Sequence, residues 1–225
     1  MSAFLGSTSV AASIALLLIG AAVTLGISML AISLGFLIAF PVCMAELSQR
    51  RVLRGLGRLY VSFFRGVPLL VQLLVIYYLL PFIGIELPSF LAAAIGLAVC
   101  TAAYQAENLR GGFLIIPAGQ AAAAQAFGYT RWKIWRHILL PQALRAAMPA
   151  VINEMIAILK ASSLVSVVGA ADLMRISQNI VARSQQPIAW YSLAALIYLG
   201  LNLVLAALGR RSEMRLSRGS ARASL

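Results

Sequence analysis

Residues 118–141, AGQAAAAQAFGYTRWKIWRHILLP, form a basic and aromatic segment in a chain that is otherwise strongly apolar. The first ten of these residues are uncharged and rich in Ala and Gln, which favour a helix, but about 20 residues are needed to cross a bilayer. Gly128 is a typical residue to end such a helix. The next residues have the composition of a membrane–water interface, with Tyr129, Trp132 and Trp135 among Arg131, Lys133 and Arg136.

This pattern predicts a short helix outside the membrane, a turn, and an interfacial helix that leads into a membrane span. Pro141 limits where the helix of that span begins. A plain amphipathic connector between two spans is the simpler alternative, and on these residues alone it stays open.

The whole chain has the composition of a membrane protein. Of its 225 residues, 62% are hydrophobic and 11% are charged, and its mean hydropathy is +0.94. A soluble domain of this length needs more polar surface. Cys43 and Cys100 lie in apolar runs without ligand spacing or a disulfide pattern, and His137 lies among basic interfacial residues. We therefore expect no metal site, no hydrolytic cluster and no cofactor of the chain's own.

Five apolar stretches predict an all-α polytopic membrane protein, with residues 1–225 as a single transmembrane domain. The sequence RGVP at residues 65–68 predicts a turn or a broken helix at the entry to the second stretch. Gly20, Gly26 and Gly35 favour close packing of the first helix. The predicted spans are residues 14–44, 69–85, 89–106, 146–171 and 190–208.

Arginine residues concentrate after the first span, after the third span and in the C-terminal tail, where Arg215, Arg218 and Arg222 lie. The other connections hold few basic residues. The positive-inside rule then places the N-terminus outside and the C-terminus inside, which requires an odd number of spans. The net charge of +12 is accordingly interpreted as topology and contact with lipid headgroups, not as a nucleic-acid surface.

The same segment matches a known spacing pattern: Glu-Ala-Ala, three residues, Gly, nine residues, then Ile-x-Leu-Pro. It resembles the signature loop of the inner-membrane permease subunits of ABC importers. Ala122 stands where that family usually has Glu, so any salt bridge or cap made by the family's Glu is missing here. The matching positions are Ala123, Ala124, Gly128, Ile138, Leu140 and Pro141.

Further blocks resemble the polar amino acid permease branch, which includes histidine, glutamine and arginine permeases. Residues 65–72, RGVPLLVQ, resemble RGTPLLVQ, and residues 141–145 match PQALR. Tyr104, Glu107 and Arg110 with the two glycines that follow resemble AYxAExxRGG. Lys160 and residues 162–166 resemble LKxxSLVS. The resemblance covers about residues 65–173.

The resemblance implies a multi-pass subunit of the bacterial inner membrane that imports a polar amino acid by alternating access. The partners it implies are two cytoplasmic ATPases, a second permease subunit and a periplasmic amino-acid-binding protein. Residues 118–127 would be the helix that couples the permease to the ATPase. The chain has no Gly-Lys dipeptide and therefore no phosphate-binding GxxxxGK[ST] loop, so we expect ATP and Mg²⁺ on the partner ATPase and no enzymatic activity here.

Polar residues within the spans are the candidates for the substrate pathway. Glu154 and Lys160 are six residues apart, about 240° around a helix, and so do not form a simple pair within it. Glu154 either faces a central cavity, where it would favour cationic amino acids, or contacts the second permease subunit. Lys160 either lines the pathway or stabilises a helix break. The candidates are Gln72, Tyr104, Glu154, Lys160, Ser162 and Ser163.

Gln72 and Tyr104 also suit ordinary hydrogen bonds between helices. Glu107 and Arg110 are interpreted as cytoplasmic support, either as a surface pair three residues apart or as a contact to the coupling segment. The alternative function is a secondary amino acid transporter driven by an ion gradient, which predicts a repeat between halves that this sequence lacks. The sequence leaves open which amino acid is carried and whether the two permease subunits are identical.

Overall fold

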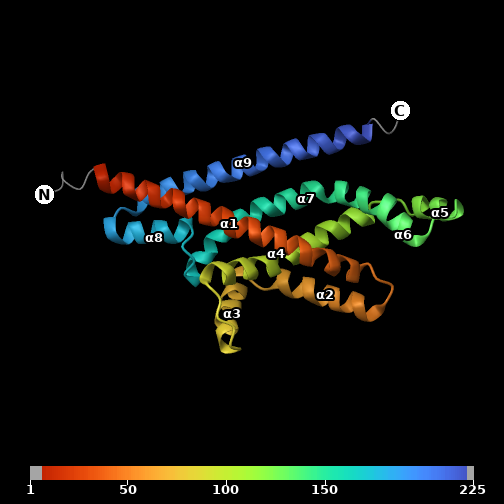
Figure 1. The fold of residues 1–225 in the computed structure, drawn as a ribbon, viewed down its shortest axis with the longest axis horizontal. Helices are drawn as coiled ribbons and strands as arrows, with labels where there is room; N and C mark the ends of the chain where they lie inside the picture. Colours follow the sequence, from red (N-terminus) through yellow and green to blue (C-terminus); the bar gives the residue numbers. More distant parts are fainter. Residues whose placement is uncertain (1–6, 222–225) are drawn as a thin grey trace.

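The computed structural model describes residues 7–221, and within them the chain consists of helices and their connections, without strands (Figure 1). This confirms the predicted all-α class. A π-helical segment η1 precedes α7, and a 3₁₀ segment η2 follows it. The elements are α1 Ser7–Glu46, α2 Arg51–Gly66, α3 Leu69–Phe82, α4 Ser89–Leu114, α5 Ala118–Ala126, α6 Arg131–Ile134, η1 Trp135–Leu139, α7 Leu140–Ala161, η2 Ser162–Val168, α8 Leu173–Ser184 and α9 Pro187–Ala221.

Four helical segments are long and apolar enough to cross a membrane, so the chain is polytopic. A fifth span is present if α2 and α3, which meet at a bend of 107°, count as one broken span. The four segments are Val10–Glu46, Ser89–Leu114, Arg131–Val168 and Pro187–Arg211.

Within the second predicted span, residues 69–85, the structure places the short helix α3. The helix there ends at Phe82, because Gly84 takes a left-handed φ of 81°. Its 14 residues extend about 21 Å, less than the hydrocarbon thickness of about 30 Å. At its start Val67 is extended and Pro68 has no backbone N–H, so α2 cannot continue into α3. In Figure 1, α3 projects away from the long axis of the molecule.

Helix α4 lies at the centre of the packing, against α1 and α7. Glycine allows the close approach: a Cβ on Gly35 would collide with the Thr101 side chain, and a Cβ on Gly112 with the Ala143 carbonyl. Gly20 of α1 likewise leaves a Cβ only 2.9 Å from Leu173. Gly26 does not act in this way, because its Cβ would make an ordinary 3.6 Å contact.

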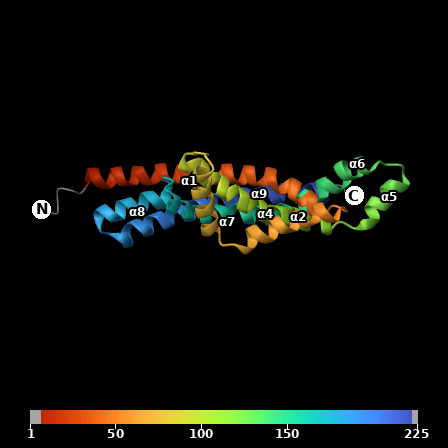
Figure 2. The ribbon, with the colours of Figure 1, turned by 90° about the horizontal axis from the view of Figure 1, so that it is seen from below.

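The molecule has two distinct ends, which Figures 1 and 2 show from two directions. Helix α8 lies beside the N-terminal half of α1 at one end. The other end contains α5, α6, the end of α1 and the end of α9. The arginines of α2 and of α6 and η1 belong to this second end. Of the basic tail, the side chains of Arg215 and Arg218 and the whole of Arg222 lie outside the described residues.

A buried polar cluster holds the end with α8 together. Asp172, which is fully buried, accepts a 2.9 Å hydrogen bond from the Arg175 backbone N–H and thereby caps α8. Tyr198 of α9 donates a 3.3 Å hydrogen bond to the same carboxylate. The Thr24 hydroxyl of α1 accepts one of 3.0 Å from the Leu173 N–H. Three helices are joined in this way.

A candidate coupling helix and substrate pathway

Helix α5 is short, exposed and built from small residues. It has nine residues, a length of about 13 Å. Ala122 and Ala123 are exposed, whereas Ala124 is buried against the rest of the molecule. Because the exposed side chains of α5, apart from that of Gln125, are no larger than a methyl group, a partner surface can approach the helix backbone closely.

Gly128 ends this helix, as the sequence predicts. Its φ is 78°, a left-handed conformation that side chains rarely adopt. The Gly128 N–H donates to the Gln125 carbonyl at 2.9 Å, and the Tyr129 N–H donates to the Ala124 carbonyl at 3.1 Å. These two bonds form a Schellman motif, which satisfies carbonyls that the end of a helix leaves free. No other atom lies within 4 Å of a Cβ built on Gly128, so its dihedral angle, not space, requires glycine.

The interfacial helix α6 begins at Arg131, after the two connecting residues that follow Gly128. The Thr130 hydroxyl caps α6 by accepting from the Lys133 N–H at 3.4 Å, and Ile134, 3% exposed, anchors the helix in the core. Phe127 is 83% exposed and Trp132 62% exposed. The turn between α5 and α6 therefore presents aromatic side chains outward.

Pro141 does not start a new helix, and residue 146, where the fourth predicted span begins, lies inside a helical segment that starts at Arg131. The chain is helical without a break from α6 into α7, because the π-helical segment η1 allows Pro141 to lie within the helix. In this π-helical segment the Leu140 N–H donates to the Trp135 carbonyl, five residues back. The wider turn accommodates a residue that has no N–H to donate. Ile138 and Leu140, both half-buried, lie on either side of the join.

A glutamine pair joins the short helix to the span. The Gln142 side-chain amide donates to the Gln120 carbonyl oxygen at 2.7 Å and to the Ile138 backbone carbonyl at 2.8 Å. Both amide hydrogens are therefore used. We call this contact the Gln120–Gln142 bridge; it fixes α5 relative to η1 and α7.

Glu107 and Arg110 form the predicted pair at the end of α4. Arg110 donates two hydrogen bonds to the Glu107 carboxylate, at 2.8 and 2.9 Å. Arg65 of α2 adds an ion pair at 3.7 Å and lies over the Tyr104 ring, 5.4 Å from its centre. These residues line a cavity of about 830 Å³ that also contains Glu46 of α1. Their contacts thus join α4 to α2 at this end.

Gln72 stabilises the bend between α2 and α3. Its side-chain amide donates to the Phe64 carbonyl at 2.8 Å and to the Val67 carbonyl at 2.7 Å. Residue Gln72 is 4% exposed. The sequence offers two roles for Gln72, a lining residue of the substrate pathway or a hydrogen bond between helices. These contacts match the hydrogen bond.

Glu154 is half-buried in α7 and accepts a 3.3 Å hydrogen bond from the Thr101 hydroxyl of α4. Lys160 is exposed one turn and a half further along. The structure therefore does not bring these two ionisable residues together. Glu154 is directed instead to the α4–α7 contact.

The helix break after Lys160 is made by serine. The Ser162 hydroxyl donates to the Leu159 carbonyl at 2.8 Å, Ser163 to Lys160 at 2.9 Å, and Ser166 to Ser163 at 2.8 Å. Each bond reaches back three residues, the spacing of the 3₁₀ segment η2. Residues 162–168, in the last part of the predicted span 146–171, are therefore 3₁₀-helical and not α-helical.

Residues 31–218 match the profile of a family described as the binding-protein-dependent transport system inner membrane component. The chain belongs to this family. The octopine transport system permease protein OccM of Rhizobium meliloti is 37% identical over 201 residues, which cover 85% of this chain and 82% of that protein. The arginine transport system permease protein ArtQ of Bacillus subtilis is 34% identical over 198 residues, 88% of this chain and 90% of that protein.

Solved structures agree with this assignment. The crystal structure of an amino acid ABC transporter with histidines is 34% identical, with a TM-score of 0.85, and the match covers 92% of this chain and 97% of that chain. Inward-facing MetNI, a methionine ABC transporter, has a TM-score of 0.79 at 24% identity, covering 96% and 99%, and shows the shared fold. The resemblance drawn from the sequence motifs is confirmed: the chain is a membrane-spanning ABC permease subunit.

In this permease the signature-loop residues lie together at one end, from Ala122 to Pro141. Sequence reasoning did not find Gln120, Gln142 as a bridging residue, Thr101 or the Thr130 cap. Thr101 was detectable in principle as a hydroxyl in an otherwise apolar stretch. No local sequence pattern indicates the Gln120–Gln142 bridge, because its two residues are 22 apart in the sequence.

Proposed function

We propose that this permease moves a polar amino acid across the bacterial inner membrane by alternating access, driven by separate ATPase subunits. The relatives named above transport octopine and arginine, and a similar solved structure is an amino acid transporter. ATP and Mg²⁺ bind the ATPase in this proposal, and the permease itself carries out no chemistry.

The geometry of α5 is the observation that supports coupling to an ATPase most directly. It is an exposed helix of small residues at one end of the molecule, closed by the Schellman motif at Gly128 and joined to α7 by the Gln120–Gln142 bridge. A displacement of α5 would therefore be transmitted to η1 and α7, the helix that carries Glu154. Rigid movement of this kind is the common basis of alternating access.

We further propose that Tyr104, Glu154 and the serine-rich η2 belong to the substrate pathway, with Lys160 beside it. Gln72 serves the bend and not the pathway. Glu154 is half-buried in a helix long and apolar enough to cross a membrane, where a carboxylate is costly unless it has a partner. Its single Thr101 hydrogen bond leaves acceptor capacity for a substrate ammonium or guanidinium group.

The remaining partners follow from the same proposal. A second permease subunit would complete the pathway, and a periplasmic binding protein would deliver the amino acid at the end that contains α8. Ala122 is exposed and has no charge, so docking at α5 would rest on shape and on Gly128. We propose a heteromer, in which the sister subunit's loop compensates for the missing acid.

Reconstitution tests this function. The permease, expressed with the ATPase and permease genes beside its own, should co-purify with the ATPase and, in vesicles, take up an amino acid only when ATP is supplied. Uptake that persists without any ATPase and collapses with the proton gradient would establish the alternative, a secondary transporter. Full activity of a pure homodimer would exclude the heteromer but keep the ATP-driven function.

A further inference from the structure

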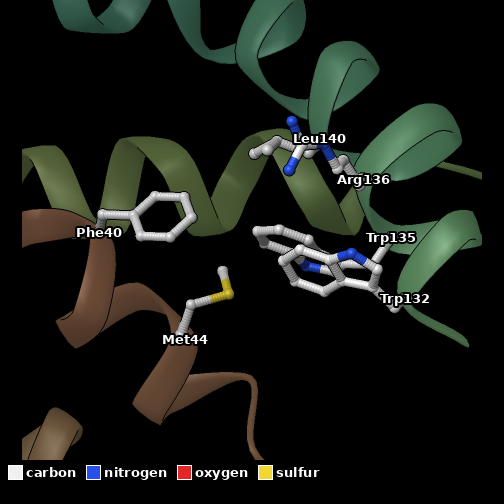
Figure 3. Close-up of a pocket in the computed structure, with 6 residues that line it drawn as sticks. All are labelled: Phe40, Met44, Trp132, Trp135, Arg136 and Leu140. Atoms are coloured by element: carbon white, nitrogen blue, oxygen red, sulfur yellow. The ribbon is translucent and has the colours of Figure 1, made fainter.

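An apolar groove lies between the end of α1 and the start of the long helix that includes α6, η1 and α7. Its volume is about 660 Å³. Figure 3 shows its lining side chains converging from the two helices. They are Phe40, Met44, Trp132, Trp135, Arg136 and Leu140.

Aromatic rings form the walls of this groove. Trp132 and Trp135 stack with 5.4 Å between their centres and an 18° angle between their planes. The rings of Trp135 and Phe40 meet edge to face with 5.8 Å between their centres, which joins η1 to α1. Trp132, 62% exposed, leaves a large indole face open. Three aromatic rings in mutual contact therefore form part of the groove wall.

The groove lies where two membrane-crossing segments meet the interface. Phe40 and Met44 are in the last two turns of the segment Val10–Glu46, and the other lining residues are in the first turns of Arg131–Val168. Tryptophan is enriched at this depth because its ring is apolar and its N–H is polar. A molecule in the groove would accordingly be in contact with both hydrocarbon and water.

The charge at the groove is positive. Arg136 is the charged residue among its lining residues, and Arg131 and Lys133 lie on the adjoining turns. None of the six lining residues is a carboxylate, so the groove offers no partner for the ammonium group of an amino acid. A ligand that matches it has a hydrocarbon part and an anionic head.

We propose that this groove binds an anionic phospholipid. The acyl chain lies against Phe40, Met44 and the indole of Trp135, and the phosphate is held by Arg136. A guanidinium group suits a phosphate because its fork of donors matches two oxygens. The bound lipid would fill the space between α1 and the coupling end of the molecule, so that the headgroup composition of the membrane acts on the part of the permease that carries α5.

Tryptophan quenching tests the proposal directly, and it needs neither ATPase nor substrate. The chain has three tryptophans, and Trp190 lies at the other end, where its ring nitrogen is buried without a hydrogen-bond partner. The full-length Trp190→Phe protein, in phosphatidylcholine vesicles, therefore reports on Trp132 and Trp135. Phosphatidylglycerol with brominated acyl chains should quench this emission at about fivefold lower mole fraction than brominated phosphatidylcholine, the effect of one basic residue at an anionic surface.

Two matched variants separate binding from general attraction. Arg136→Gln should abolish the difference between the two lipids, whereas Arg131→Gln, which removes an exposed charge next to the groove, should keep most of it. Both arginines are exposed, so both proteins should fold, which circular dichroism checks. Equal quenching by both lipids, or an equal effect of the two variants, would overturn the proposal. Absence of quenching by either lipid would show that protein covers the groove, and would also overturn it.

Discussion

Gly128 shows how one residue determines the shape of the end that contains α5 and α6, because its left-handed φ of 78° turns the chain between these two helices. We expect Gly128→Ala to lower ATP-dependent uptake, since a Cβ in this conformation costs about 1–2 kcal/mol, a factor of about 5–30 in the population of the capped turn. Gly128→Asn should recover much of the activity, because Asn tolerates this conformation. Uptake into vesicles measures both.

Gly119 provides the control within the same helix. It has open space around it and no positive φ, so Gly119→Ala should leave uptake unchanged or stabilise α5 slightly. Normal transport by the Gly128→Ala protein would show that α5 does not need this turn.

A second prediction concerns the contact between Glu154 and Thr101. We expect Glu154→Leu and Thr101→Val each to lower the melting temperature in detergent, because each removes one partner of the 3.3 Å hydrogen bond between α7 and α4. The double variant should lose less than the sum, with a coupling energy of about 0.5–1.5 kcal/mol. Additive effects would mean that Thr101 does not hold Glu154.

Among the elements, α5 and α7 are joined by the Gln120–Gln142 bridge, with its 2.7 Å side-chain hydrogen bond. Gln142→Leu should leave ATP hydrolysis by the assembled transporter largely intact and lower uptake severalfold, since α5 would move without α7. Gln120→Leu should do the same, and the double variant should be no worse than either single variant. Uptake per ATP hydrolysed is the measurement.

Gln125, an exposed glutamine of the same helix, gives the matched control. Gln125→Leu should keep the ratio of uptake to hydrolysis. If all three glutamine variants lower that ratio equally, polarity of α5 matters and the bridge does not.

Element types were largely predictable from the sequence, whereas several joins between elements were not. The composition of residues 118–127 predicted α5, and Gly128 predicted its end, because both effects are local. The continuous helix through Pro141 was missed, since a π-helical turn depends on how the whole segment packs. Gln72 donates hydrogen bonds to the Phe64 and Val67 carbonyls at the bend, and no local sequence pattern predicts these contacts. The partner of Glu154 was missed because Thr101 is 53 residues away.

For the whole molecule, the predicted orientation is the property that most needs a measurement. Both native cysteines are buried, Cys43 fully and Cys100 to 4% exposed, so a new cysteine can be labelled selectively. With the N-terminus outside, an impermeant maleimide added to intact spheroplasts should label Gln186→Cys, between α8 and α9, and should label Gln125→Cys only after lysis. Both positions are exposed. The opposite labelling would reverse the predicted topology.

The π-helical segment before α7 has a consequence for how such a permease changes during evolution. A π turn is an α-helix that contains one additional residue. Removing one residue from Trp135–Leu139 would restore regular helix and leave the segments on either side in nearly the same relative rotation, because the wide turn already accommodates the additional residue. A single codon can thus be gained or lost at this turn without turning the end that contains α5 away from the proposed ATPase.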